Sequence, residues 1–510
     1  LQVMFYPFVM MDIPVENALE NPYTGESGQP AYPWRGQITC DPAPGREGSP
    51  DGSVAAAAQV QALFGAAEAA DFSASGTTVS YSGPAEWSLR RMVLHYAKLC
   101  AAAGGVESFL IGSEFEALTR VRSAPGIYPA VNELVALAAE ARTILGSATK
   151  VSYAANWSEY GAHVVDAEAS EVRFPLDPLW ASPDIDFVGI DFYAPLSDWR
   201  EGNAHLDAAI AKTIYEPSYL RANLRAGENY DFFYADASGR RDQLRLPIAD
   251  GAFGKPWMFR AKDIWNWWRE PHVERAGGEE LETPTAWIPE SKPIRFTEAG
   301  CPAVDKGANQ PNVFPDLKSA LGGFPHFSNR KRDDLIQRRY LEAVCSQFDP
   351  AYGASDGDNP QSSLYSGRML DPAGIYPWAW DARPYPAFPL AADVWSDGGN
   401  WETGHWLNGR LGAAPLDDLL GAILADAGAE DTDTSQLRGA ADGYVIDRPM
   451  SARSAIEPLA PAFSFDAVEE EGTLIFRQRG GEAVAAFTED ELLIEGDDAG
   501  CRLIRAQETE

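Results

Sequence analysis

Histidine, cysteine and positive charge are all scarce in this 510-residue chain. The six histidines are scattered, and none pairs with another at metal-ligand spacing, so the sequence predicts no metal site and no cofactor. It also contains no P-loop, no zinc motif and no Gly-x-Ser-x-Gly elbow. These absences argue against nucleotide hydrolases, metalloproteases and esterases.

The cysteines are few, far apart and odd in number, and no Cys-x-x-Cys pair is present. This pattern is typical of reduced thiols in a protein that folds in the cytoplasm. No apolar run reaches the length of about 18 residues that a membrane helix needs, and no signal-peptide pattern opens the chain. The five cysteines are Cys40, Cys100, Cys301, Cys345 and Cys501.

Acidic residues outnumber basic ones by 75 to 41, which gives a formal net charge of −34. Such a chain repels phosphate backbones, so we expect no direct nucleic-acid binding and interpret the acidity as a source of solubility. A hydrophobic content of 45% over 510 residues exceeds what one core needs. The sequence therefore predicts two or more domains.

Six strand-like segments recur along the chain, and most are separated by helical patterns. Near-continuous apolar strands that alternate with helices indicate a parallel sheet covered by helices. The predicted strands are residues 1–11, 107–112, 150–155, 185–192, 293–297 and 374–380. The predicted helices before four of them are residues 86–103, 131–145, 259–268 and 333–348.

Polar or aromatic residues directly follow these strands, as expected for a (β/α)₈ TIM barrel whose site lies at the C-terminal strand ends. A doubly wound sheet is the main α/β alternative, but it usually carries a glycine-rich phosphate turn, which is absent here. A closed barrel needs eight strands and the pattern gives six. We therefore expect the first two strands to lie upstream, and the chain to be a fragment of a longer polypeptide.

Two long insertions interrupt the predicted barrel at residues 14–84 and 196–254. The first should contain a short helix at 54–70, and the second a helix with extended arms; loops this long are often functional. The composition changes near residues 408–415, which predicts a barrel domain over 1–410 and a small, mostly β domain over 411–510. Its predicted elements are a helix at 417–427 and short strands at 443–445, 462–467, 472–477, 483–487 and 492–495.

Two glutamates stand where a barrel would place its chemistry. Glu298 ends a buried strand in the string FTEAG, and Glu114 follows another in IGSEFE. Retaining glycoside hydrolysis needs two carboxyl groups about 5–5.5 Å apart, which strand ends facing across a barrel mouth can supply. Glu116 is the rival of Glu114 but lies further from the strand end, and the alternative for each position is a surface glutamate that begins a loop.

These segments resemble clan A glycoside hydrolases, whose acid/base glutamate follows strand 4 and whose nucleophile ends strand 7. The resemblance implies that Glu114 is the acid/base and Glu298 the nucleophile. It also implies that Tyr193 hydrogen-bonds the nucleophile, and that Trp378 and Trp380 form the aromatic sugar platform.

The match to the clan has one departure. Ser113 stands where the clan usually has an asparagine that contacts the sugar 2-hydroxyl, and we expect the shorter hydroxyl to reach the sugar through a bridging water. Trp157 either lines the sugar groove or covers the barrel rim. Asp12 and Asp191 are expected to orient substrate or a neighbouring side chain.

A closer resemblance is to the large tail protein of gene transfer agents, the phage-like particles of alphaproteobacteria. It rests on the strings FLIGSE at 109–114 and FTEAGCP at 296–302, and on the tryptophan-rich helix at 265–268. It covers about residues 1–410. The strings DGY at 442–444 and EGTLIFR at 471–477 are similar to the tail hub domains of the same protein, although these motifs are weaker.

The resemblance implies a tail-tip or baseplate subunit, assembled as a homotrimer with other tail and baseplate proteins. Its barrel would bind or cleave host cell-surface glycan or peptidoglycan during DNA delivery. The alternative is a catalytically inactive carbohydrate-binding or purely structural tail module, which Ser113 and the long insertions favour.

Overall fold

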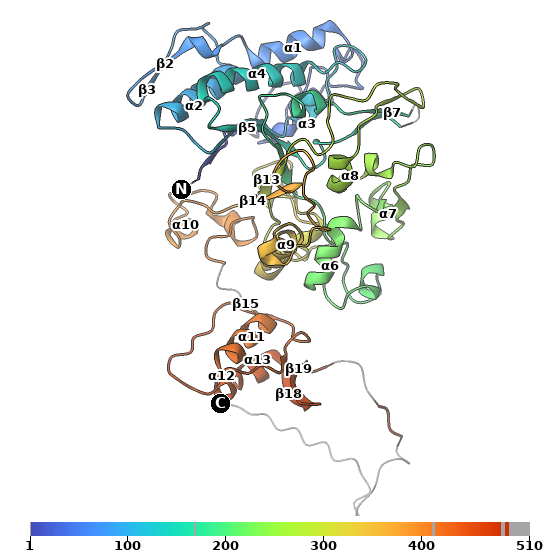
Figure 1. The fold of residues 1–510 in the computed structure, drawn as a ribbon, viewed down its shortest axis with the longest axis vertical. Coiled ribbons are helices and arrows are strands. Elements are labelled where there is room, and N and C mark those ends of the chain that lie inside the picture. The colour runs from blue at the N-terminus through green and yellow to red at the C-terminus, as the bar shows by residue number, and fades with distance from the viewer. Residues whose placement is uncertain (1, 168–169, 411–413, 481–484, 489–510) are drawn as a thin grey trace, which may run out of the picture. The chain divides into compact units, whose positions relative to one another are not determined.

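The computed structural model describes residues 2–167, 170–410, 414–480 and 485–488. The chain divides into two compact units, Leu1–Leu411 and Gly412–Glu510, which are treated separately below (Figure 1). The first contains the parallel sheet, both long insertions and every candidate site residue predicted from the sequence.

A six-stranded parallel sheet is the core of the first unit. Its inner strands are buried on both faces, as expected where helices cover a parallel sheet, and the predicted α/β fold is confirmed. In sheet order the strands are β1 (Met4–Phe5), β4 (Ser108–Ser113), β5 (Lys150–Asn156), β8 (Val188–Phe192), β13 (Ile294–Ala299) and β14 (Leu370–Pro377).

The first strand is much shorter than predicted. We expected residues 1–11 to form one strand, but only Met4 and Phe5 pair with β4. Pro7 follows closely and has no amide hydrogen to donate to a neighbouring strand, which favours an early end to the ladder. The chain beyond it carries Tyr6 and Phe8 toward the strand ends, where both contact site residues.

The sheet is curled, because side chains from distant strands meet on its concave side. The Tyr6 hydroxyl, just after β1, donates to Asp191 on β8 at 2.9 Å, although β4 and β5 lie between these strands in the sheet. At the N-terminal ends of the strands, Arg295 on β13 donates to both oxygens of Glu107, just before β4, at 3.1 Å each. A small apolar cluster fills the space between; it consists of Met4, Tyr6, Leu110, Ala154 and Phe187.

Helices cover the outer face of the curled sheet. In Figure 1, α1, α2 and α4 lie together on one side, and α9 lies on the other side next to α6. Their starts follow local signals, since Ser88 caps α2, Pro129 begins α4 and Asp333 caps α9. The bounds are α1 (Val54–Phe64), α2 (Leu89–Ala102), α4 (Pro129–Leu145), α6 (Pro217–Ala222) and α9 (Asp334–Phe348).

The predicted tryptophan-rich helix at 259–268 is two shorter pieces, η5 (Pro256–Phe259) and α8 (Ile264–Arg269). Between them, the buried Lys262 ammonium donates to three backbone carbonyls, those of Pro195, Asn223 and Ala226. These bonds tie the second insertion to the chain just after β8, and Asp263, the next residue, caps the start of α8.

The insertions contain short elements rather than a second core. The first carries η1 (Arg35–Gln37), α1, η2 (Ala69–Asp71) and the hairpin β2 (Phe72–Ser75) and β3 (Thr78–Tyr81). The second carries η3 (Leu206–Ala209), α6, η4 (Asn223–Arg225), β9 (Phe232–Phe233), α7 (Ala237–Arg241) and β10 (Leu246–Pro247). A separate antiparallel sheet comprises β6 (His163–Asp166), β7 (Glu171–Arg173), β11 (Arg275–Ala276) and β12 (Glu279–Glu280).

The second unit has its own small apolar core, in which Leu420, Phe465 and Phe476 are buried. The hairpin β18 (Phe465–Glu470) and β19 (Thr473–Gln478) turns at Glu471 and Gly472, and both residues adopt the positive φ that a two-residue hairpin turn favours. The predicted strand at 492–495 and part of that at 483–487 lie outside the described residues. The other elements are β15 (Ala414–Pro415), α11 (Leu416–Asp426), β16 (Thr432–Asp433), β17 (Ala440–Ala441), α12 (Ala452–Ile456) and α13 (Leu459–Phe463).

We expect the Arg295 bridge to stabilise the curled sheet. Although burial opposes it, hydrogen bonding to Arg295 lowers the pKa of Glu107 to about 2, and Asp371 on β14 lies 3.0 Å from the same guanidinium. Arg295→Met leaves both carboxylates without this partner and should lower the free energy of unfolding by about 2–4 kcal/mol. Arg241→Met, in an exposed pair with Asp242, is the control and should leave the free energy of unfolding nearly unchanged, because solvent screens an exposed pair. If urea unfolding gave the same change in free energy for Arg295→Met and Arg241→Met, the stabilising role of the Arg295 bridge would be contradicted.

Candidate functional site

The two predicted carboxylates lie at the C-terminal ends of their strands. Glu114 follows the last residue of β4, and Glu298 is the fifth residue of β13. Both are buried, with 5% and 3% of their surface exposed. Glu114 has a φ of 48°, a left-handed conformation that L-residues other than glycine rarely adopt. Such local strain is concentrated at functional sites, so it marks this position as a candidate for chemistry.

Glu114 is held by three side chains from two different segments. One carboxylate oxygen, Oε2, accepts the indole N–H of Trp34 at 2.7 Å and lies 2.8 Å from Nη2 of Arg35. The other, Oε1, accepts an N–H of Asn156 at 3.1 Å. Trp34 and Arg35 come from the first insertion, whereas Asn156 ends β5. The insertion therefore contributes directly to the site.

Arg35 links the ends of two strands. Its Nε donates to the Ser113 hydroxyl at 2.8 Å, and its Nη2 lies 3.3 Å from the Tyr6 hydroxyl. The guanidinium carbon lies 3.7 Å from the ring centroid of Phe8, whose ring stacks on Trp378 at 6.1 Å. Although burial opposes it, the neighbouring Glu114 raises the pKa of Arg35 above its ordinary value. Arg35 is thus a fixed positive charge beside the carboxylates.

Glu298 has one engaged oxygen and one without a partner. The Tyr193 hydroxyl donates to Oε2 at 2.7 Å, as the resemblance implied. Oε1 is buried and has no hydrogen-bond partner among the described residues. Burial, followed by repulsion from Glu114, raises the pKa of Glu298 to about 8, while Arg35 and the hydroxyls of Tyr193 and Tyr6 oppose the rise. The resting site therefore favours a proton on Glu298 at neutral pH.

Asp191, on β8, is a third carboxyl group in the same cluster and is fully buried. Its two oxygens accept the hydroxyls of Tyr6 at 2.9 Å and Thr297 at 2.6 Å. Burial and repulsion by Glu298 raise its pKa well above the ordinary value. Asp191 connects β1, β8 and β13, so its geometry is that of a support for the two glutamates.

A further buried carboxyl group, Glu159, holds the residues next to Glu114. It accepts the backbone N–H of Asn156 at 3.0 Å and the Tyr153 hydroxyl at 2.9 Å. That hydroxyl in turn accepts the backbone N–H of Phe115 at 2.7 Å. Burial, followed by repulsion from Glu116, raises the pKa of Glu159 to about 8. This network fixes the ends of both β4 and β5.

The remaining predicted residues differ in how close they come to this cluster. Trp378 reaches it through Phe8, and its backbone N–H donates to Ala299 on β13 at 2.8 Å. Trp157 is buried in the main core, and its backbone N–H donates to the carbonyl of Asp191. Trp380 is 63% exposed. The rival Glu116 is paired with Arg120 at 2.7 Å and with the Ser158 hydroxyl, while Asp12 is exposed.

Several residues of the cluster had not been identified from the sequence. Tyr6 lies within the predicted strand at 1–11, and Asn156 directly follows the predicted strand at 150–155. A signal for both existed, since each is a polar residue at the C-terminal end of a strand. Trp34 and Arg35 carried no such signal, because they lie far from any strand, in a proline- and glycine-rich insertion.

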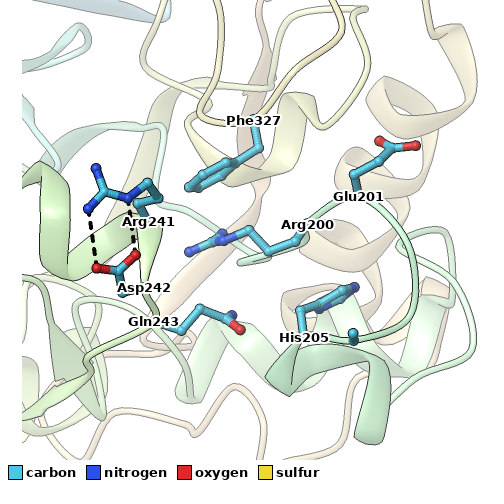
Figure 2. A pocket seen from close by; sticks show the side chains of 8 residues that line it. Arg200, Glu201, His205, Arg241, Asp242, Gln243 and Phe327 are labelled. Atoms are coloured by element: carbon cyan, nitrogen blue, oxygen red, sulfur yellow. Dashed lines mark hydrogen bonds and ion pairs between the residues drawn. The ribbon is translucent and has the colours of Figure 1, made fainter.

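Figure 2 shows a separate open pocket of about 460 Å³ in the second insertion. The guanidinium of Arg200 lies 3.7 Å from the ring centroid of Phe327, and Arg241 pairs with Asp242. Arg200 is also paired with Asp198, so both arginines of the pocket are already engaged in ion pairs within the protein. None of the pocket's lining residues belongs to the carboxylate cluster.

Two further properties bear on the kind of site this is. In the part of the chain that the structure describes, no group of three or more His, Cys, Asp or Glu side chains has metal-binding geometry. Within the same residues, no helix has the length and apolar character needed to cross a membrane.

The curled parallel sheet, with paired carboxylates at its strand ends, defines a TIM-barrel-like protein. Residues 87–389, more than half of the chain, match the family described as "GTA TIM-barrel-like domain". The chain belongs to this family, whose name refers to gene transfer agents. Residues 451–510 match a second family, "Putative phage tail protein". The two matches together identify a tail component of a phage-like particle.

One similar solved structure is a GH113 beta-mannanase from Alicyclobacillus acidocaldarius, with 14% sequence identity and a TM-score of 0.26. The alignment covers 62% of this chain and 56% of the mannanase chain. A comparison with curated proteins gives no match.

The raised pKa of Glu298 predicts a pH dependence of stability. Folded Glu298 keeps a proton up to about pH 8, whereas the unfolded chain releases it near 4.5. The free energy of unfolding should therefore fall as the pH rises through this window, by at most about 1.4 kcal/mol per pH unit for one proton. Glu298→Gln should make that fall shallower in urea unfolding between pH 5 and pH 8. Asp191→Asn and Glu159→Gln measure the shares of the two other buried carboxyl groups with raised pKa values, and an unchanged slope in Glu298→Gln would refute the assignment.

Proposed function

We propose that this chain is a tail-tip or baseplate component whose barrel cleaves host cell-envelope glycan by retaining hydrolysis. The observation that carries the proposal is the state of Glu298. Its Oε2 is fixed by Tyr193, whereas its buried Oε1 has no hydrogen-bond partner among the described residues and is the oxygen that we assign to the nucleophilic attack. Glu114, from the facing strand end, lies close enough to be the second-largest cause of its raised pKa.

In the proposed reaction, Oε1 of Glu298 attacks the anomeric carbon of the glycan. The bond from that carbon to the leaving oxygen breaks, its electron pair goes to the oxygen, and Glu114 supplies the proton. A water molecule then gives a proton to Glu114 and attacks the same carbon, which releases Glu298. The first step requires a proton on Glu114 and none on Glu298, the reverse of the resting preference. We therefore expect the bound glycan to displace Arg35 from Glu114 or otherwise to change the charges around the two glutamates.

The proposal predicts a defined pattern of lost activity. Glu298→Gln and Glu114→Gln should each lower sugar release from isolated bacterial envelopes and peptidoglycan sacculi by about 10²–10⁴-fold. Glu116→Gln is the matched control, because Glu116 is paired with Arg120 and Ser158, and it should keep near-normal activity. Reducing ends measure the rate, and proton NMR of the first products should show retained anomeric configuration.

A second candidate function has its own support in the geometry. Arg35 and Trp34 occupy Oε2 of Glu114, and both glutamates are buried, which suits a barrel that binds glycan without cleaving it. Wild-type protein that co-sediments with sacculi but releases no sugar would replace the hydrolase with this binding module. If the protein neither binds nor cleaves sacculi, the remaining candidate is a structural role in the tail.

The assembly of the chain remains a prediction from the family resemblance. We propose a homotrimer in contact with other tail and baseplate proteins at the particle's tip. The measurement is the mass of the purified full chain in solution, together with its position in intact particles.

A further inference from the structure

Trp34 is the side chain through which the buried carboxylate pair approaches the surface. Its indole N–H contacts Oε2 of Glu114 at 2.7 Å, yet the residue itself is partly exposed. Glu114 and Glu298 are buried, so a glycan that reaches them has to pass the groups that cover them. Trp34 is one of these groups.

The indole ring of Trp34 packs against the backbone of Gly36, two residues further along the chain. A Cβ atom added at Gly36 would lie 2.3 Å from two carbons of the Trp34 ring, so the ring packs directly over the glycine backbone. This packing fixes the plane of the ring beside Glu114. The φ of Gly36 is not in the positive region, so an alanine is compatible with the backbone conformation, and the three atoms nearest to its Cβ all belong to the Trp34 ring.

We propose that Trp34 is the aromatic platform for the leaving-group sugar, the pyranose unit on the aglycone side of the bond that is cut. This inference rests on the proposed hydrolysis. An acid/base carboxylate must lie beside the leaving oxygen, and Trp34 contacts that carboxylate directly. An aromatic face beside the leaving oxygen packs against the apolar face of a pyranose, while the indole N–H keeps Glu114 in position.

The tryptophans predicted from the sequence fit this role less well. Trp157 is buried in the main core, and Trp378 reaches the cluster through the Phe8 ring. Trp380 is largely exposed, whereas the side chains that hold the Glu114 carboxylate are Trp34, Arg35 and Asn156. The geometry therefore assigns the leaving-group side to the first insertion rather than to β14.

The test compares three variants of the full chain on peptidoglycan sacculi. Trp34→Ala should raise KM about tenfold or more, and Gly36→Ala should do the same, because its Cβ displaces the ring without removing it. Trp34→Phe keeps an aromatic face and should restore KM to within about threefold, although its kcat falls because the N–H donor to Glu114 is lost. Trp87→Ala, at a tryptophan that is 94% exposed, is the control and should leave both constants unchanged.

The outcomes separate this inference from the proposed function. Wild-type cleavage with an unchanged KM in Trp34→Ala and Gly36→Ala would overturn the platform and leave the hydrolase intact. If the wild type binds sacculi without cleaving them, the hydrolase is wrong, and co-sedimentation then decides: weaker binding by both variants supports Trp34 as a glycan contact, and equal binding overturns it. Matching urea unfolding midpoints for all variants show that the differences are not losses of folding.

Discussion

Charge balance at the strand ends is the constraint on which the rest of the site depends. Three carboxyl groups, Glu114, Asp191 and Glu298, are buried together, and Arg35 places a positive charge beside them. Because buried charges are costly unless they are paired, Arg35 and the proton on Glu298 allow the cluster to exist within a folded barrel. Arg35 is in turn held by the ends of β1 and β4 through Tyr6 and Ser113, so the curl of the sheet and the charge balance are coupled.

The same constraint gives Ser113 a role other than the one expected. An asparagine at this position would be free to contact a sugar hydroxyl, as the clan A resemblance implied. Here the Ser113 hydroxyl accepts Nε of Arg35, and Asn156 from the neighbouring strand donates to Glu114 instead. The departure in sequence thus accompanies a different arrangement of donors, in which an arginine from an insertion stands next to the acid/base candidate.

The sequence predicted the architecture well because strands and helices carry local periodic signals. The inner strands, α2, α4 and α9 lie within a few residues of their predicted ranges, and the strand ends pointed to Glu114, Glu298 and Tyr193. It failed where a contact depends on tertiary structure. Nothing local distinguishes Trp34 or Arg35 from other insertion residues, because Glu114, which both contact, lies about 80 residues further along the chain. Pro7 is a local signal for the early end of β1, but the apolar run around it predicts a longer strand.

Two features of the cluster bear on whether such a barrel is kept for chemistry or for architecture. Glu114 adopts a left-handed φ, and Oε1 of Glu298 is buried without a partner among the described residues. Each costs stability, the first through backbone strain and the second through an unsatisfied buried polar atom. A barrel retained only for tail architecture gains nothing from either cost, whereas a nucleophile needs an unengaged oxygen. The Arg35 ion pair argues in the other direction, because it holds Glu114 as a paired carboxylate, and the proposed hydrolysis requires the glycan to change that pairing.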